Sequence, residues 1–468
     1  MAVKTGKIDW SDRLNPVLVK EIRQSFHNYG VLTVMGVLLA AQLVLLVVMQ
    51  YQVSRNPEAF SGTGAVMFGF VVTGMALAAL LIGALGTLLR FTAERRSREL
   101  DFSFLTTLSP NRIVWGKLAG AMVMTVFIFA LCLPFIVISY FLRGIGMEQM
   151  LFVVLTLFPM VCVASQLAIL IGSAGQRWLV SVFVLLAFFG SWPCVIFMIL
   201  MIDSVFSGNK SLPGIMLLWY GCSGMLLGLL YALSVAAIGA RRSNRMLPVR
   251  LSLIGIFLLS PLVGLGVGLI GNVPRLGVTT LLFMSGFGSA AAALCATIAA
   301  FERFDPGKRV MRKCPKNRFG KFWFLLVSSG ARAGIGLAVL LTVLSALVAA
   351  AVYKMDRGIG MNTFLWAASC CYFIFYANVA LGAKKRLKQL PGWCWWAVTV
   401  IVFVAIPVLF GGTVSALSRV WQPYFFTTTP FCTAFGAQSH ALVWIGPSLA
   451  LLSSLPAAFS ALSWRKRP

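Results

Sequence analysis

The chain has 468 residues, of which 59% are hydrophobic and only 11% are charged, and its formal net charge is +27. Its mean hydropathy is +0.91. Apolar runs of about 20 residues recur along the chain, and one such run spans the roughly 30 Å hydrocarbon core of a bilayer as a helix. The alternating segments that build membrane barrels are absent. The composition therefore excludes a soluble globular class and predicts an all-α, polytopic integral membrane protein.

The first expected element is an amphipathic helix that precedes the first apolar run. Asn15 suits a helix N-cap, and Pro16 suits the first helical position. The apolar positions repeat at every fourth residue and are Leu18, Ile22 and Phe26. The polar positions are Lys20, Glu21, Arg23 and Gln24. This pattern predicts a helix that lies in the inner membrane interface, with its apolar side toward the lipid.

Apolar runs predict about twelve transmembrane helices, each long enough to cross the bilayer. The first follows 30 mostly polar residues and is expected to be an uncleaved anchor. The expected spans are 31–52, 64–89, 113–141, 150–173, 178–202, 214–239, 251–271, 278–301, 325–353, 363–382, 393–415 and 441–463.

A polar island at residues 94–117 interrupts the apolar sequence between the second and third spans. Its apolar positions, which share one helical face, are Leu100, Phe104, Leu105 and Leu108. Its polar positions are Glu94, Arg95, Arg98, Glu99 and Asp101, followed by a break at Ser109 and Pro110. The pattern alone leaves two interpretations open. The segment is either a helix that lies on lipid or a docking element for a cytoplasmic partner.

Lysine and arginine are distributed very unevenly between the two sides of the membrane. With the N-terminus inside, the cytoplasmic segments hold 30 of these cations and the opposite loops hold seven. An excess of cations marks the cytoplasmic side, so both termini are expected in the cytoplasm of a bacterial-type inner membrane. Headgroups of the bilayer and insertion topology account for the net charge of +27, so no nucleic-acid partner is expected.

Several kinds of chemistry are missing from the sequence. None of the twelve acidic residues falls near the middle of an expected span, which argues against a proton- or sodium-driven transporter. No GxxxxGK[ST] motif occurs, so the chain is not expected to hydrolyse ATP itself. The two histidines, His27 and His440, lie far apart and predict no metal site. We therefore expect neither a catalytic residue nor a bound cofactor.

The segment NPVLVKEIRQ and the polar island together resemble the elbow helix and the first coupling region of ABC-2-type transporter permeases. The positions of the island that match are Glu94, Arg95, Leu100, Thr106, Leu108, Ser109, Pro110, Ile113, Gly116 and Lys117, with Asp101 for a family glutamate. The positions that depart are Arg98, Glu99 and Thr107. The resemblance covers about residues 13–240 and agrees in order and spacing as well as in residue type.

The resemblance implies a permease subunit, with an exporter as the expected direction, that pairs with a separate ATP-binding subunit. ATP and Mg²⁺ would be held by that partner, and a second permease copy could complete the transporter. Residues 94–110 would form the cytoplasmic coupling helix that docks on the partner. The implied docking residues are Glu94, Arg95, Arg98, Asp101, Phe104, Leu105, Leu108, Ser109 and Pro110. The implied elbow residues are Asn15, Pro16, Leu18, Ile22 and Phe26.

The expected organisation is a cytoplasmic N-terminus (1–30), a permease domain of six spans (31–240) and a second six-span membrane domain (241–468). The second domain is either a divergent repeat or an accessory domain, and the sequence at the start of its 302–324 loop reads Phe301-Glu302-Arg303, with Phe301 just before the loop. The alternative function is a non-transporting membrane scaffold or assembly protein. A membrane enzyme would need a polar cluster, for which the outer segment 416–440 is the one candidate.

Overall fold

The structure is a computed structural model, and every element among the residues that it describes is helical. The described residues are 15–55, 63–97, 109–142, 146–174, 212–239, 244–270, 276–302, 312, 314–356, 367 and 370–382, with the single positions 448 and 453. No strand occurs among them. Eight of the described helices are long and apolar enough to cross a membrane. The chain is therefore a helical, multi-pass membrane protein.

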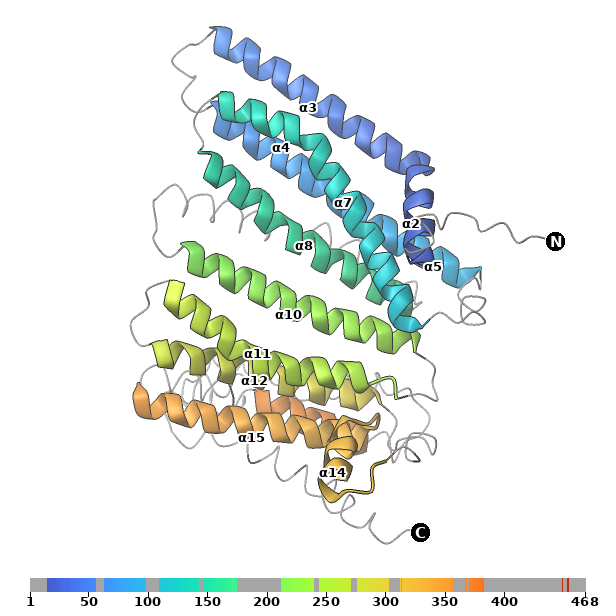
Figure 1. Cartoon of the computed structure of the whole chain (residues 1–468), viewed down its shortest axis with the longest axis vertical. Helices are drawn as coiled ribbons and strands as arrows, with labels where there is room; N and C mark the ends of the chain where they lie inside the picture. The colour runs from blue at the N-terminus through green and yellow to red at the C-terminus, as the bar shows by residue number, and fades with distance from the viewer. Residues whose placement is uncertain are drawn as a thin grey trace, which may run out of the picture. The chain divides into compact units, whose positions relative to one another are not determined.

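The chain divides into two compact units. One contains Met1–Leu212 with Trp219–Gly239, and the other contains Pro213–Leu218 with Ala240–Pro468. The helices of the first unit (Figure 1) are α2 (Pro16–Phe26), α3 (Tyr29–Arg55), α4 (Thr63–Ala79), the π-helix η2 (Leu80–Leu85), α5 (Gly86–Arg96), α7 (Pro110–Phe141), α8 (Met147–Ala174) and most of α10 (Leu212–Ile238). Those of the second unit are α11 (Leu247–Ile270), α12 (Leu276–Phe301), α14 (Arg318–Val327) and α15 (Ala331–Met355).

Eight of the expected spans correspond to helices of the structure. These helices are Tyr29–Gln52, Gly64–Arg95, Pro110–Phe141, Met147–Ser173, Met216–Ile238, Leu247–Ile270, Gly277–Phe301 and Ala331–Met355. The expected spans 178–202, 393–415 and 441–463 lie outside the described residues, apart from two single positions in the last. The expected span 363–382 appears as the shorter apolar helix Cys370–Gly382. The total of about twelve spans stays a prediction.

The second span is one continuous helical rod in which a π-helical segment joins α4 to α5. The face of this helix that packs against the rest of the unit carries fully buried apolar side chains, among them Met67, Val71 and Met75. At Gly83, inside the π-helical segment, a Cβ atom would lie 3.2 Å from the Thr125 hydroxyl of α7 and 3.4 Å from the Ser165 hydroxyl of α8. The missing side chain therefore lets three helices of the first unit approach closely at this level.

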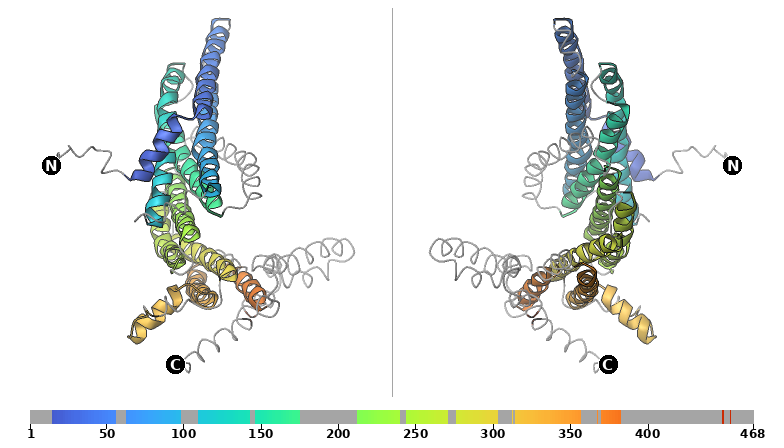
Figure 2. Two further views of the ribbon diagram at one scale, coloured as in Figure 1. Left: turned by 90° about the vertical axis from the view of Figure 1, so that its right-hand side faces the viewer. Right: turned by 90° about the vertical axis from the view of Figure 1, so that its left-hand side faces the viewer.

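One boundary of the expected spans is wrong. The apolar run 325–353 predicts a single helix, but the structure ends α14 at Val327 and begins α15 at Ala331. Gly330 between them has φ 152° and ψ 137°, a conformation that side chains with a Cβ atom rarely adopt. The sharp break allows α14 to leave the direction of α15, as Figure 2 shows. The sequence carries a local sign of this break, because residues 328–332 read Ser-Ser-Gly-Ala-Arg inside the otherwise apolar run.

The conformation of Gly330 generates a stability prediction. We expect Gly330→Ala to lower the unfolding free energy by about 1–3 kcal/mol, because alanine is strained in this backbone conformation. The measurement is the unfolding of the purified protein in detergent micelles by a titrated denaturing detergent. The matched control is Gly286→Ala in α12, where a Cβ atom would meet nothing within 4 Å. Equal effects of the two substitutions would show that Gly330 carries no backbone constraint.

Candidate docking base at one end of the first unit

Helix α2 starts with a cap that also attaches it to α7. The side-chain oxygen of Asn15 accepts a hydrogen bond from the backbone N–H of Val17 at 3.1 Å, and Pro16 occupies the first turn. The Asn15 side-chain nitrogen donates to the backbone oxygen of Arg112, in the first turn of α7, at 2.6 Å. One side chain therefore both begins α2 and holds it to the start of the third span.

The face that α2 turns toward the protein differs from the expected one. Val17 is half-buried, and Glu21 and Ser25 are buried, whereas Phe26, at the end of the apolar stripe, is exposed. The expectation that Glu21 lies on the exposed polar side is therefore wrong. Of the stripe, Leu18 and Ile22 are half-buried, and the ring of Phe26 packs edge-on against Phe127 of α7 at 5.3 Å between centroids.

Two glycines of α7 explain why Glu21 faces inward. A Cβ atom on Gly116 would lie 2.7 Å from the Cβ of Val17, and one on Gly120 would lie 2.9 Å from the Cβ of Glu21. Because neither glycine has a side chain, the backbone of α7 approaches α2 closely along this row. The close approach places the Glu21 carboxylate beside Lys117, which lies between the two glycines in the sequence.

A cluster of five charged side chains joins α2, α5 and α7, and we call it the ion cluster: Lys20, Glu21, Arg90, Glu94 and Lys117. The Lys117 ammonium donates to Glu21 at 2.5 Å and to Glu94 at 2.6 Å, and the Lys20 ammonium donates to the other oxygen of Glu94 at 2.8 Å. The Arg90 guanidinium lies 3.8 Å from Glu21 and also donates to the Ser25 hydroxyl. Three cations thus face two carboxylates where α2, α5 and α7 meet.

The centre of the ion cluster is buried. The side chains of Lys117 and Glu21 are 2% and 3% exposed, and that of Glu94 is 12% exposed. Charges in such a place cost several kcal/mol of lost hydration each, which close pairing offsets. The Lys117 ammonium also lies 4.7 Å from the centre of the Phe91 ring, a favourable cation–π contact. The ion pairs therefore fix the positions of α2, α5 and α7 relative to one another.

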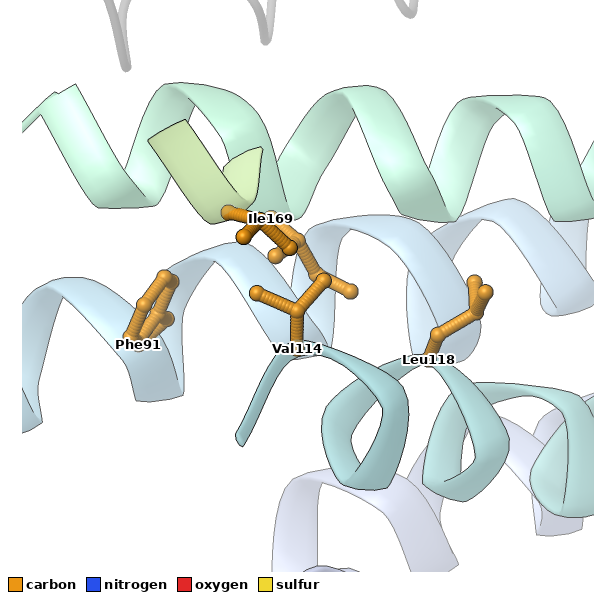
Figure 3. Close-up of a cluster of buried hydrophobic side chains, with 5 residues drawn as sticks. Phe91, Val114, Leu118 and Ile169 are labelled. Atoms are coloured by element: carbon orange, nitrogen blue, oxygen red, sulfur yellow. The ribbon is translucent and has the colours of Figure 1, made fainter. Parts of the chain in front are cut away.

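An apolar layer borders the ion cluster and joins four helices. Phe91, Val114, Leu118 and Ile169 point toward one another in Figure 3 and form a buried group with Val235 of α10. A Cβ atom on Gly172 of α8 would lie 2.8 Å from Phe91 Cδ1, so α8 and α5 are in close contact there. This end of the first unit is therefore a packed base.

The structure places the described members of the expected docking set at this base. Glu94 and Arg95 belong to the last turn of α5, which continues the second span, and not to a separate interfacial helix. The Glu94 carboxylate is bound within the chain by Lys117 and Lys20, and its membership of the docking set stays a prediction. Arg95 is exposed, Ser109 is the exposed N-cap of α7, and Pro110 is its half-buried first residue.

The remaining five expected docking residues lie outside the described residues, and these are Arg98, Asp101, Phe104, Leu105 and Leu108. Their segment leaves α5 after Ser97 and re-enters the described structure at Ser109, so both of its ends are attached to the packed base. Sequence reasoning missed the parts that Glu21, Arg90 and Lys117 play in this base. The sequence signal for this contact is the pair Gly116 and Gly120, which lie before and after Lys117 and allow another helix to approach the lysine closely.

The described residues contain no group of three or more His, Cys, Asp or Glu side chains that could hold a metal ion. The comparisons with protein-family models, with curated proteins and with solved structures give no match for this chain.

The ion cluster generates a second prediction. We expect Lys117→Met to lower the unfolding free energy by about 3–5 kcal/mol, because the buried Glu21 carboxylate loses its close partner and keeps only the Arg90 guanidinium at 3.8 Å. In the double variant Lys117→Met/Glu21→Leu, most of this loss should be recovered, because Glu94 keeps Lys20 as its partner. Unfolding in detergent by a titrated denaturant measures both values. A double variant as unstable as Lys117→Met alone would contradict the pairing.

Proposed function

We propose that the chain is the transmembrane permease subunit of an ATP-driven, ABC-2-type transporter in a bacterial-type inner membrane, and that it exports its substrate. The support is the order of elements in the first unit: an amphipathic helix, two spans, a polar island and a third span. ATP and Mg²⁺ are bound by a separate ATP-binding subunit, since the chain has no phosphate-binding loop.

The observation that carries the proposal is the ion cluster. A docking segment transmits motion only if its ends are rigidly connected to the spans. Residues 98–108 leave the end of the second span beside Glu94 and rejoin the third span seven residues before Lys117, and these two side chains bind each other. Glu21 adds α2 to the same base. A displacement of the docking segment therefore acts on three helices together.

The proposed mechanism uses the partner's ATP cycle to select between two arrangements of the spans. Phe104, Leu105 and Leu108 pack into a groove of the ATP-binding subunit, and Arg95, Arg98 and Asp101 set the register of docking by charge. Closure of the partner's ATP-bound dimer moves the segment and, through the ion cluster, the ends of the spans. The ion cluster acts as a connection and takes no part in ATP hydrolysis.

The test is co-purification of the full-length, membrane-inserted protein with its ATP-binding partner. We expect a P-loop ATPase to co-purify in mild detergent. Arg98→Glu/Phe104→Ala should reduce the recovered ATPase by roughly 30-fold, the equivalent of about 2 kcal/mol for the loss of a central aromatic and a charge. Membrane insertion should be unchanged, as measured by the amount of protein in the membrane fraction.

The matched control is Arg55→Glu/Tyr51→Ala, which makes the same two kinds of change at the opposite end of a span. Arg55 lies over the Tyr51 ring at 4.8 Å, and both residues are at the end of α3 that is expected outside the cytoplasm. We expect the control to keep the ATPase. Unchanged recovery with Arg98→Glu/Phe104→Ala would show the docking assignment to be wrong. If no ATPase accompanied the unaltered protein, the alternative of a non-transporting scaffold would be favoured.

A further inference from the structure

Helix α14 in the second unit lies at the membrane face. It ends at Val327, and the span α15 begins at Ala331. Three intervening residues reach at most about 10 Å, so the C-terminal end of α14 cannot lie far from the membrane boundary. The segment 302–324, which contains the first turns of α14, carries eight lysines and arginines, which identifies this face as the expected cytoplasmic one.

The C-terminal end of α14 is fixed by a buried arginine. The guanidinium of Arg250, near the start of α11, donates to the backbone oxygen of Leu326 at 3.0 Å, to that of Gly330 at 2.8 Å and to that of Ser328. It also pairs with Glu302 at 2.8 Å, and Glu302 accepts from the backbone N–H of Gly330 at 2.6 Å. The positive charge of Arg250, placed at the carboxyl end of α14, stabilises that helix end.

The fixed end leaves one face of α14 outside the protein. Leu326 and Val327 are buried, but one turn earlier Phe322 is 56% exposed and Trp323 is 43% exposed. Lys321 beside them is exposed. Two large aromatic side chains and an ammonium group therefore share an uncovered surface beside the start of a span.

The charge of the surrounding sequence is of one sign. Residues 312–321 contain five lysines and arginines and no acidic residue, and of these Arg312, Lys316 and Lys321 are exposed in the structure. Tryptophan and other aromatic side chains favour the headgroup level of a membrane, and exposed cations there attract anionic phosphate. A surface with both features, within reach of the bilayer, is complementary to an anionic lipid.

We propose that α14 and the segment before it form a binding surface for anionic phospholipid of the cytoplasmic leaflet. The ammonium groups of Lys316 and Lys321 bind the lipid phosphate, and the rings of Phe322 and Trp323 insert beside the upper acyl chains. The buried pair of Arg250 and Glu302 holds this surface at a constant place relative to α15. The proposal concerns the second unit alone and does not depend on the transport function.

The test is the binding of phosphatidylglycerol and phosphatidylcholine to the full-length protein in detergent, measured by native mass spectrometry. We expect tighter binding of phosphatidylglycerol. Each lysine near an anionic surface strengthens binding roughly fivefold, so Lys316→Gln/Lys321→Gln should weaken phosphatidylglycerol binding by about 25-fold. Binding of phosphatidylcholine should not change. Phe322→Ser/Trp323→Ser should weaken the binding of both lipids, because the two aromatic rings contact the acyl chains and not the charged headgroup.

The matched control is Lys354→Gln/Tyr353→Ser, which removes an exposed cation and an exposed aromatic ring at the other end of α15. This control should keep the preference for phosphatidylglycerol. The proposal is overturned if Lys316→Gln/Lys321→Gln keeps the full preference, or if the control loses it equally. Inorganic phosphate, added in excess, should not displace the lipid; displacement would identify a site for free phosphate instead. Unchanged thermal midpoints of the variants establish that they are folded.

Discussion

Charge burial at the ends of membrane helices is the constraint on which the rest of the structure depends. The Lys117 ammonium is buried near the start of the third span, where an unpaired charge would be severely destabilising. It is tolerated because Glu21 and Glu94 approach it from two other helices. The close approach requires Gly116 and Gly120, since any side chain there would push α2 away. Packing and charge pairing at this base therefore depend on each other.

The second unit uses the same device with different residues. Glu302 directly follows α12, and it binds Arg250 of α11 and the backbone N–H of Gly330 just before α15. In both units, a glutamate at or just after the end of one span binds a cation of a neighbouring span, but Lys117 belongs to the span after Glu94 and Arg250 to the span before Glu302. The sequences at these ends, Glu94-Arg95 and Glu302-Arg303, are also alike. Each unit thus holds helices together through a buried pair of opposite charges.

Much of the fold was predictable because hydropathy and helix length are local properties. Eight expected spans correspond to helices, since a run of apolar residues in a bilayer must satisfy its own backbone hydrogen bonds. The inward orientation of Glu21 was not predictable from its neighbours, because it depends on glycines about a hundred positions further along the chain. The break at Gly330 was missed although its signal, Ser328-Ser329-Gly330 followed by Arg332, is local.

The sequence by itself determined the membrane class, the positions of the described spans and the cap of α2 by Asn15, because each depends on residues close together in the chain. Only the tertiary structure decided which polar side chains are exposed and which are buried in pairs between helices. Glu94 and Arg95 are adjacent in the sequence, yet Glu94 is bound by two lysines and Arg95 is exposed. The physical reason is that burial of a charge depends on partners from other helices, and a one-dimensional pattern does not specify which helices meet.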